Sequence, residues 1–207
     1  MNQTKRKLVD ATIETLRDQG IAGVSARTIA TTAGVNQALV FYHFGSVGGL
    51  LAAASTAAAG QRADLYRERF AQVTSLRELL AVGRDLHEAE RHAGNVTVLA
   101  QTLAGSQNDP ELAAATAAAL NIWVAELELV LDRILGDSPL AELADVPGLA
   151  RAIAAAFIGL ELYGGADPQG AEQALRTLDS LGSILEFIDD LGPVTSRVLR
   201  TKIRRTT

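Results

Sequence analysis

Cysteine is absent from the 207 residues of this chain. Without it the chain forms no disulfide, holds no thiolate-bound metal and needs no oxidising compartment. Aromatic side chains are also scarce, at 4% of the sequence, although 48% of the residues are hydrophobic. Most of the apolar mass is therefore alanine and leucine. Because these residues are strong helix formers, an all-α fold is predicted.

Long apolar runs are missing as well. The sequence contains no stretch of about 18 uninterrupted apolar residues, so no membrane span is predicted. The strongest candidate, residues 152–163, is too short and contains Glu161. The basic run at residues 5–7 leads into an amphipathic stretch, whereas a signal peptide would continue with an apolar segment. We therefore expect a cytoplasmic protein with no membrane partner.

The net charge of −5 is distributed unevenly along the chain. Residues 1–50 carry five basic and three acidic side chains, and residues 51–196 carry nine basic and twenty-one acidic ones. The last eleven residues carry five basic side chains and no acidic one. Binding to phosphates requires local positive charge, so the first fifty residues suit nucleic acid better than the acidic body. The small excess of basic over acidic side chains in these fifty residues is ordinary, however. The basic tail is interpreted as a solvated chain end.

Glycine and proline divide the chain into segments with helical periodicity, and no linker is long enough to separate independent domains. Ser25, Asn36 and Ser46 are suited to cap the second, third and fourth helices, while Gly20 and the Gly164-Gly165 pair end two others. Together with a short helix in the tail, nine to ten helices are expected. The predicted segments are residues 4–19, 26–33, 37–44, 47–73, 75–91, 96–103, 110–135, 149–163 and 168–191.

Residues 25–44 have the pattern of two short helices that cross over a tight turn. Ala30 is small where the helices touch, and Gly34 lies where the turn requires a positive φ angle. The expected buried wedge consists of Ile29, Ala33, Val35 and Val40. The exposed side of the third helix, with Gln37, Ala38, Tyr42 and His43, is then free to face the major groove of DNA.

This segment resembles the DNA-binding head of the TetR family of helix-turn-helix transcriptional regulators. The resemblance covers residues 5–50 and is carried by Gly20, Ser25, Ile29-Ala30, Ala33-Gly34-Val35, Tyr42-His43-Phe44 and Leu50. It implies a DNA-binding domain over residues 1–46 and an effector-binding and dimerisation domain over residues 47–207. The implied function is that of a ligand-responsive repressor that binds a palindromic operator as a homodimer.

The resemblance also implies roles for residues of the head. Gln37 is the candidate for reading adenine, Ala38 and Leu39 for contacting thymine methyl groups, and Arg27 for a phosphate or a guanine edge. For Gln37 the alternative is a solvated position in the first helical turn. Further contacts, mainly to phosphates, are expected from Lys5, Arg6, Ser25, Thr28, Asn36, Tyr42, His43 and Ser46.

One position departs from the family pattern. The family usually carries a lysine early in the fourth helix, about three residues after Phe44, and this lysine binds a phosphate. Here the position is Val47. The Ser46 hydroxyl and the free N–H groups at the helix start remain as candidate phosphate ligands.

In the body, the resemblance implies a dimer interface on the last two long helices and an effector pocket among the helices before them. The alternative for both sets is that they belong to the core of the chain or, for His87, to its surface. A small apolar effector is expected if one exists. The interface residues are Ile153, Ala156, Leu160, Tyr163, Leu175, Leu178, Leu185 and Ile188, and the pocket residues are Phe70, His87, Gln101, Thr102, Asn121, Trp123 and Phe157.

An enzyme is the first rival function. The chain has three histidines and no paired metal-ligand motif or glycine-rich phosphate loop, so no catalytic, cofactor or metal site is expected. The second rival is a protein of TetR shape that binds DNA or a partner protein without a small-molecule effector. The sequence leaves this alternative open, together with the choice between repressor and activator, the operator sequence and the target genes.

Overall fold

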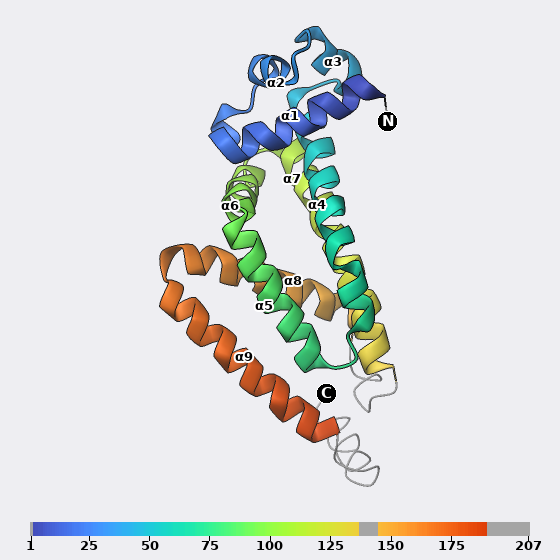
Figure 1. Cartoon of the computed structure of the whole chain (residues 1–207), viewed down its shortest axis with the longest axis vertical. Helices are drawn as coiled ribbons and strands as arrows, with labels where there is room; N and C mark the ends of the chain where they lie inside the picture. Colours follow the sequence, from blue (N-terminus) through green and yellow to red (C-terminus); the bar gives the residue numbers. More distant parts are fainter. Residues whose placement is uncertain (1, 137–144, 190–207) are drawn as a thin grey trace. The chain divides into compact units, whose positions relative to one another are not determined.

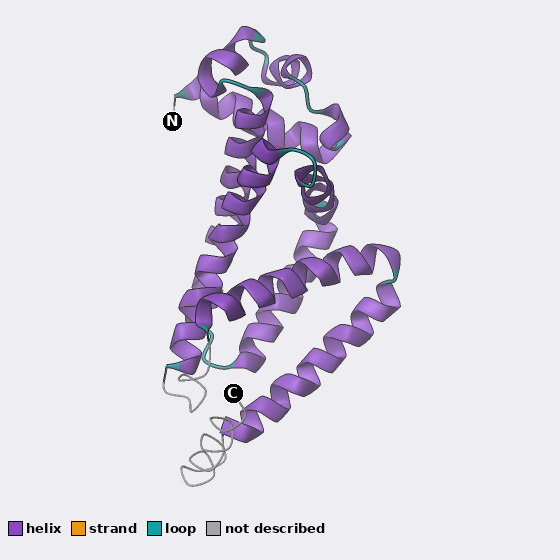
Figure 2. Cartoon of the chain, turned by 180° about the vertical axis from the view of Figure 1, so that it is seen from behind, coloured by secondary structure: helices purple, strands orange, loops and turns teal. Residues whose placement is uncertain are grey.

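The computed structural model describes residues 2–136 and 145–189, and over these residues it contains nine α-helices and no strand (Figures 1 and 2). The predicted all-α fold is confirmed. The helices are α1 (Gln3–Gln19), α2 (Ala26–Ala33), α3 (Ala38–Phe44), α4 (Val47–Gln72), α5 (Leu76–His92), α6 (Asn95–Ser106), α7 (Pro110–Leu135), α8 (Val146–Ala166) and α9 (Pro168–Asp189).

The main difference from the predicted helices concerns α8. The helix begins at Val146, since Pro147 fits the first turn, where its missing N–H group has no intrahelical partner. It also continues through the Gly164-Gly165 pair that was predicted to end it. A Cβ atom on Gly164 would lie 3.3 Å from the Cβ of Ala171, so this glycine allows close packing with α9. A 3₁₀ turn at Ile21–Gly23 was not predicted, and the expected tail helix lies outside the described residues.

The chain divides into two compact units, which we describe separately. Unit 1 comprises residues 1–65 and 89–123, and unit 2 comprises residues 66–88 and 124–207. The functional boundary expected between residues 46 and 47 stays a prediction.

In unit 1, α1 lies across the first turns of α4, with α2 and α3 packed beside it (Figure 1). Leu8, Ile29, Val40 and Leu50 are fully buried and join these four helices into one core. A second cluster, formed by Leu16, Leu51 and Leu112, adds the start of α7. Each helix contributes apolar residues at helical spacing, and Ile29 and Val40 of the predicted wedge are fully buried, while Ala33 and Val35 are half-buried beside them.

A side chain from α6 holds the end of α1. Gly20 ends α1 with φ at +67°, a left-handed conformation that favours glycine. The next residue, Ile21, donates its backbone N–H to Oε1 of Gln101 at 2.7 Å. A Cβ atom at Gly20 would come within 2.5 Å of the same oxygen, so the carboxamide packs directly on this turn.

We expect Gln101→Met to destabilise the protein by roughly 1–2 kcal/mol, because a thioether of similar length leaves the partly buried Ile21 N–H group without its acceptor. The measurement is urea unfolding at a fixed protein concentration. Gln107→Met at an exposed position of the same segment is the matched control, and equal losses for the two variants would contradict the assigned role.

Unit 2 contains most of α5, the helices α8 and α9, and the C-terminal parts of α4 and α7. Arg133 on α7 donates from Nε to the carbonyl oxygen of Val73 at 3.0 Å and from its second nitrogen to that of Phe70. These contacts satisfy carbonyl groups at the end of α4 that have no partner within the helix. At the start of α5, Glu78 accepts from the backbone N–H and the hydroxyl of Thr74. The backbone hydrogen bond, followed by that from the hydroxyl, lowers the pKa of Glu78.

Two helices are more apolar than the sequence analysis predicted. By length and composition alone, α7 and α8 are each able to cross a membrane, which corrects the expectation that no segment qualifies. Both helices carry ion pairs within unit 2, where Arg151 of α8 contacts Glu128 of α7 at 3.3 Å and Glu161 of α8 contacts His87 of α5. Only 11% of the most apolar window of α8 is buried, and Leu149, Leu162 and Tyr163 are exposed.

Candidate DNA-binding site

The turn between α2 and α3 is built on Gly34, which has φ 64° and ψ 39°. This left-handed conformation is favourable for glycine and lets Val35 donate its N–H to the carbonyl of Ala30 at 3.0 Å, which closes the end of α2. At the other end of α2, the Ser25 hydroxyl accepts from the N–H of Thr28 at 3.1 Å. Both caps match the sequence analysis, and together they fix the angle at which α3 leaves the turn.

The helix α3 buries one side and exposes the other. Val40 is fully buried in the core of unit 1, and Gln37 and Ala38 at the start of the helix are exposed. Tyr42 is 80% exposed and Phe41 is 49% exposed. A seven-residue helix with this many uncovered side chains presents a surface suited to a groove.

The apolar part of that surface differs from the prediction. Leu39, expected to meet thymine methyl groups, is only half exposed and packs against the core of unit 1. Phe41, which the sequence analysis did not single out, points outward in its place. The helical period explains this difference. Residue 41 lies three positions after Ala38 and shares its exposed face, whereas residue 39 points between that face and the buried side of the helix.

The candidate phosphate ligands lie around this helix. The hydroxyls of Ser25 and Thr28 are 2.7 Å apart at the start of α2, and Arg27 between them is exposed. Asn36 accepts from the N–H of Ala38 at 2.8 Å, but α3 begins one residue later than predicted, so its N-cap position is Gln37 and not Asn36. His43 is half-buried and packs edge-on to Tyr42, with 4.8 Å between the ring centres.

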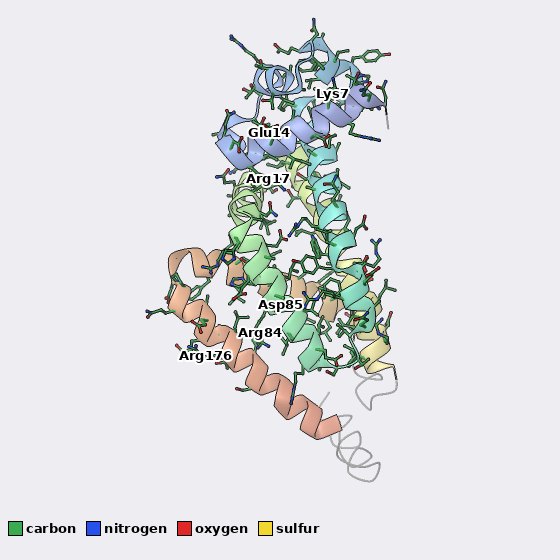
Figure 3. All side chains as sticks on the ribbon, viewed as in Figure 1. Lys7, Glu14, Arg17, Arg84, Asp85 and Arg176 are labelled. Atoms are coloured by element: carbon green, nitrogen blue, oxygen red, sulfur yellow. The ribbon has the colours of Figure 1, made fainter. Side chains whose placement is uncertain are left out.

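The N-terminal arm approaches the end of α3. The Lys5 ammonium lies 5.9 Å from the centre of the Phe44 ring, within the range of a cation–π contact. Phe44 packs against the core of unit 1. Arg6 is exposed, and Figure 3 shows Lys7 on the same end of α1, with Glu14 and Arg17 farther along the helix. The positive charge of α1 is therefore gathered at its N-terminal end, beside α3.

The start of α4 differs from the arrangement that the resemblance implies. Ser46 caps the helix by accepting from the N–H of Gly49 at 2.8 Å, as predicted, but its hydroxyl donates to Oε1 of Glu111 on α7 at 2.6 Å. Val47, at the position of the family lysine, packs against the head core. A Cβ atom on Gly48 would lie 2.4 Å from Oε2 of Glu111. The first turn of α4 thus holds a carboxylate, which the sequence analysis did not anticipate.

The predicted effector residues are divided between the two units. In unit 1, the Thr102 hydroxyl donates within its own helix to the carbonyl of Val98 at 2.7 Å, and Gln101 is engaged by Ile21. Asn121 is exposed and Trp123 is half-buried. In unit 2, Phe70 is buried, Phe157 is half-buried and His87 contacts Glu161. Their shared role in binding a ligand stays a prediction.

The exposed face of α8 is more extensive than the predicted interface. Of the predicted residues, Ala156 and Tyr163 are exposed, whereas Ile153 and Leu160 are half-buried at its side. Spacings of three and four residues put eight exposed apolar residues on one side of the helix. We call this set the α8 face: Leu149, Ala152, Ala155, Ala156, Gly159, Leu162, Tyr163 and Ala166.

On α9, Leu175 is half-buried and Leu178 is 39% exposed. The remaining predicted interface residues, Leu185 and Ile188, have side chains outside the described set.

Within the described all-α fold, α2 and α3 form a helix-turn-helix segment. Residues 8–54 match the profile of the bacterial regulatory proteins of the tetR family. This match covers the N-terminal part of the chain alone, and over these residues the chain is similar to the tetR family. Comparison with curated proteins gives no match.

Solved structures share the fold over most of the chain at low sequence identity. A TetR-family regulator from a Rhodococcus species superposes with a TM-score of 0.70 at 22% identity, covering 89% of this chain and 98% of that one. The multidrug-binding protein EbrR, complexed with proflavin, gives 0.59 at 22% identity, with coverages of 85% and 99%. A transcriptional regulator from Saccharomonospora viridis, in complex with choline, gives 0.64 at 17% identity, with coverages of 87% and 95%.

Proposed function

We propose that the chain is a ligand-responsive repressor that binds a palindromic operator as a homodimer. The observation that carries the DNA-binding part is the exposed side of α3, where Gln37, Ala38, Phe41 and Tyr42 project while Val40 anchors the helix in the core. In this proposal α3 enters the major groove. The hydroxyls at the start of α2 and the basic arm of α1 contact the flanking phosphates.

Dimerisation follows from the size of the reading surface. One seven-residue helix contacts only a few base pairs, so a specific regulator of this kind needs two half-sites about one helical turn apart. The α8 face supplies an uncovered apolar surface on which a second copy can pack, and its alanines and glycine allow the two helices to approach closely. In the dimer, this burial accounts for the apolar character of α8 without a membrane.

The direct test is selection of bound fragments from genomic or random DNA with the purified full chain. We expect the enriched fragments to share an inverted repeat with half-sites separated by about 10 base pairs or slightly more. Enrichment of a single half-site without symmetry would contradict dimeric binding, and no enrichment over bulk DNA would contradict the assigned sequence specificity.

Two substitutions on α3 should separate base reading from positioning. Gln37→Ala is expected to relax the preference at one base pair per half-site, at a cost of about 1–3 kcal/mol for the preferred base, because a carboxamide pairs with adenine through two hydrogen bonds. Tyr42→Phe removes a hydroxyl assigned to phosphate and should weaken binding to all sequences equally. Both are measured by titrating the selected operator and its single-base variants. Equal loss across all sequences for both would contradict the reading role of Gln37.

A small molecule is proposed as the effector because the neighbouring structures EbrR and the S. viridis regulator were solved with proflavin and choline, respectively. Such a ligand changes the affinity for DNA only if it binds with different affinity to two conformations of the dimer that hold the DNA-binding heads at different separations. Operator binding measured across a library of small organic molecules tests this. If no compound changes the affinity, the alternative favoured is a tetR-family DNA-binding protein without an effector.

A further inference from the structure

The glutamate that reaches the start of α4 is placed to affect DNA binding. Glu111 lies in the first turn of α7, where Asp109 caps the helix by accepting from the N–H of Glu111 at 2.9 Å and of Leu112 at 3.1 Å. Leu112 is buried with Leu16 and Leu51. This packing holds the first turn of α7 against α4, so the position of the Glu111 carboxylate follows from the core of unit 1.

The carboxylate meets two features of α4 that are suited to receive it. Oε1 accepts the hydroxyl hydrogen of Ser46 at 2.6 Å, and Oε2 lies where Gly48 lacks a side chain, since a Cβ atom there would be 2.4 Å away. Glycine inside a helix costs about 1 kcal/mol relative to alanine. Gly48 carries this cost at the position where an alanine side chain would take the space that the Glu111 carboxylate occupies.

Ser46 is also the residue that follows α3 and its closing glycine, Gly45. This inference rests on the proposed function and deepens it by one contact, in which the hydroxyl of Ser46 and the start of α4, the candidate phosphate ligands of the sequence analysis, bind a DNA phosphate. A phosphate that approaches Ser46 meets a carboxylate already bound to that hydroxyl. The position that carries a lysine in relatives is Val47 and packs in the core, so no cation at that position offsets the repulsion.

We propose that Glu111 competes with the DNA phosphate for Ser46 within the same chain. Its carboxylate lowers the affinity of the head for DNA below the value that the remaining contacts of the head would give. Two negative charges about 5 Å apart in water repel enough to change an equilibrium constant roughly fourfold. A dimer carries two such sites, so the effects multiply.

The test compares Glu111→Gln with the wild type. Glutamine keeps an acceptor for Ser46 and removes the charge, so we expect affinity for DNA to rise roughly tenfold per dimer. Because phosphate contacts are largely independent of sequence, the probe is a fluorescein-labelled duplex of arbitrary sequence and about 30 base pairs, or three helical turns. The gain should shrink between about 50 mM and about 200 mM salt, since ions screen the repulsion.

Two further variants complete the experiment. Asp18→Asn removes the same charge from an exposed position at the C-terminal end of α1. This variant should leave the affinity for DNA nearly unchanged. Gly48→Ala keeps the charge but displaces the carboxylate from Ser46, and should raise affinity in the same direction while also favouring the helix. Gly48→Ala keeps the proposal testable if Glu111→Gln proves poorly folded by thermal unfolding.

The outcomes distinguish this inference from the proposed function. If the wild type binds the duplex and both Glu111→Gln and Gly48→Ala match Asp18→Asn, Glu111 is a structural contact and the inference is overturned while DNA binding stands. If none of the proteins binds, the proposed function and the inference fall together. Binding by Glu111→Gln that exceeds binding by the wild type, with a gain that falls as salt rises, supports the inference.

Discussion

Ala156→Glu on α8 is expected to convert the proposed dimer into a monomer and to lower operator affinity about a hundredfold or more. Ala156 is exposed near the middle of the α8 face. A glutamate there would have to be buried against the same residue of the second copy, and two desolvated like charges oppose association. With one head, the protein loses the effective concentration by which binding at one half-site favours binding at the other.

The measurement combines sedimentation or light scattering with titration of the selected operator. Gln72→Glu, which adds the same charge at an exposed position at the end of α4, is the control and should stay dimeric. The helix itself should persist, because alanine and glutamate differ little in helix propensity. A variant that remains dimeric with unchanged operator affinity would show that the second copy does not pack on the α8 face.

His87→Leu is expected to lower the free energy of unfolding by about 3 kcal/mol. His87 and Glu161 form a contact between α5 and α8 in which their side chains are only 14% and 2% exposed, respectively. Removal of the imidazole leaves the buried carboxylate without this partner. Removing one member of a buried pair destabilises a protein more than replacing both members with apolar residues. The double variant His87→Leu/Glu161→Leu should therefore recover most of the loss.

Urea unfolding at one fixed protein concentration measures the effect, since dimerisation makes apparent stability depend on concentration. Arg176→Leu is the control, because Arg176 pairs with Glu172 at an exposed site (labelled in Figure 3) and should cost well under 1 kcal/mol. If the single variants at positions 87 and 161 were additive in the double variant, the two side chains would not be energetically coupled.

Much of the head could be predicted from sequence because its determinants are local. Ser25 and Gly34 lie at the two ends of one short helix, and each acts through a backbone group within a few residues. The burial of Val40 and the exposure of Gln37 and Tyr42 follow from helical period once the turn is fixed. The outward position of Phe41 was not predicted, because apolar residues occupy most positions of this seven-residue helix and give no clear periodic signal.

The sequence by itself determined the helical segments, the capping residues and the outward side of α3, because those depend on neighbours within one or two turns of the chain. Tertiary structure alone decided that Gln101 closes the turn at Ile21, that Glu111 reaches Ser46, and that Glu161 meets His87. These partners are 80, 65 and 74 residues apart in sequence. No local pattern encodes which helices pack together at such separations, and a polar side chain acquires its partner only when they do.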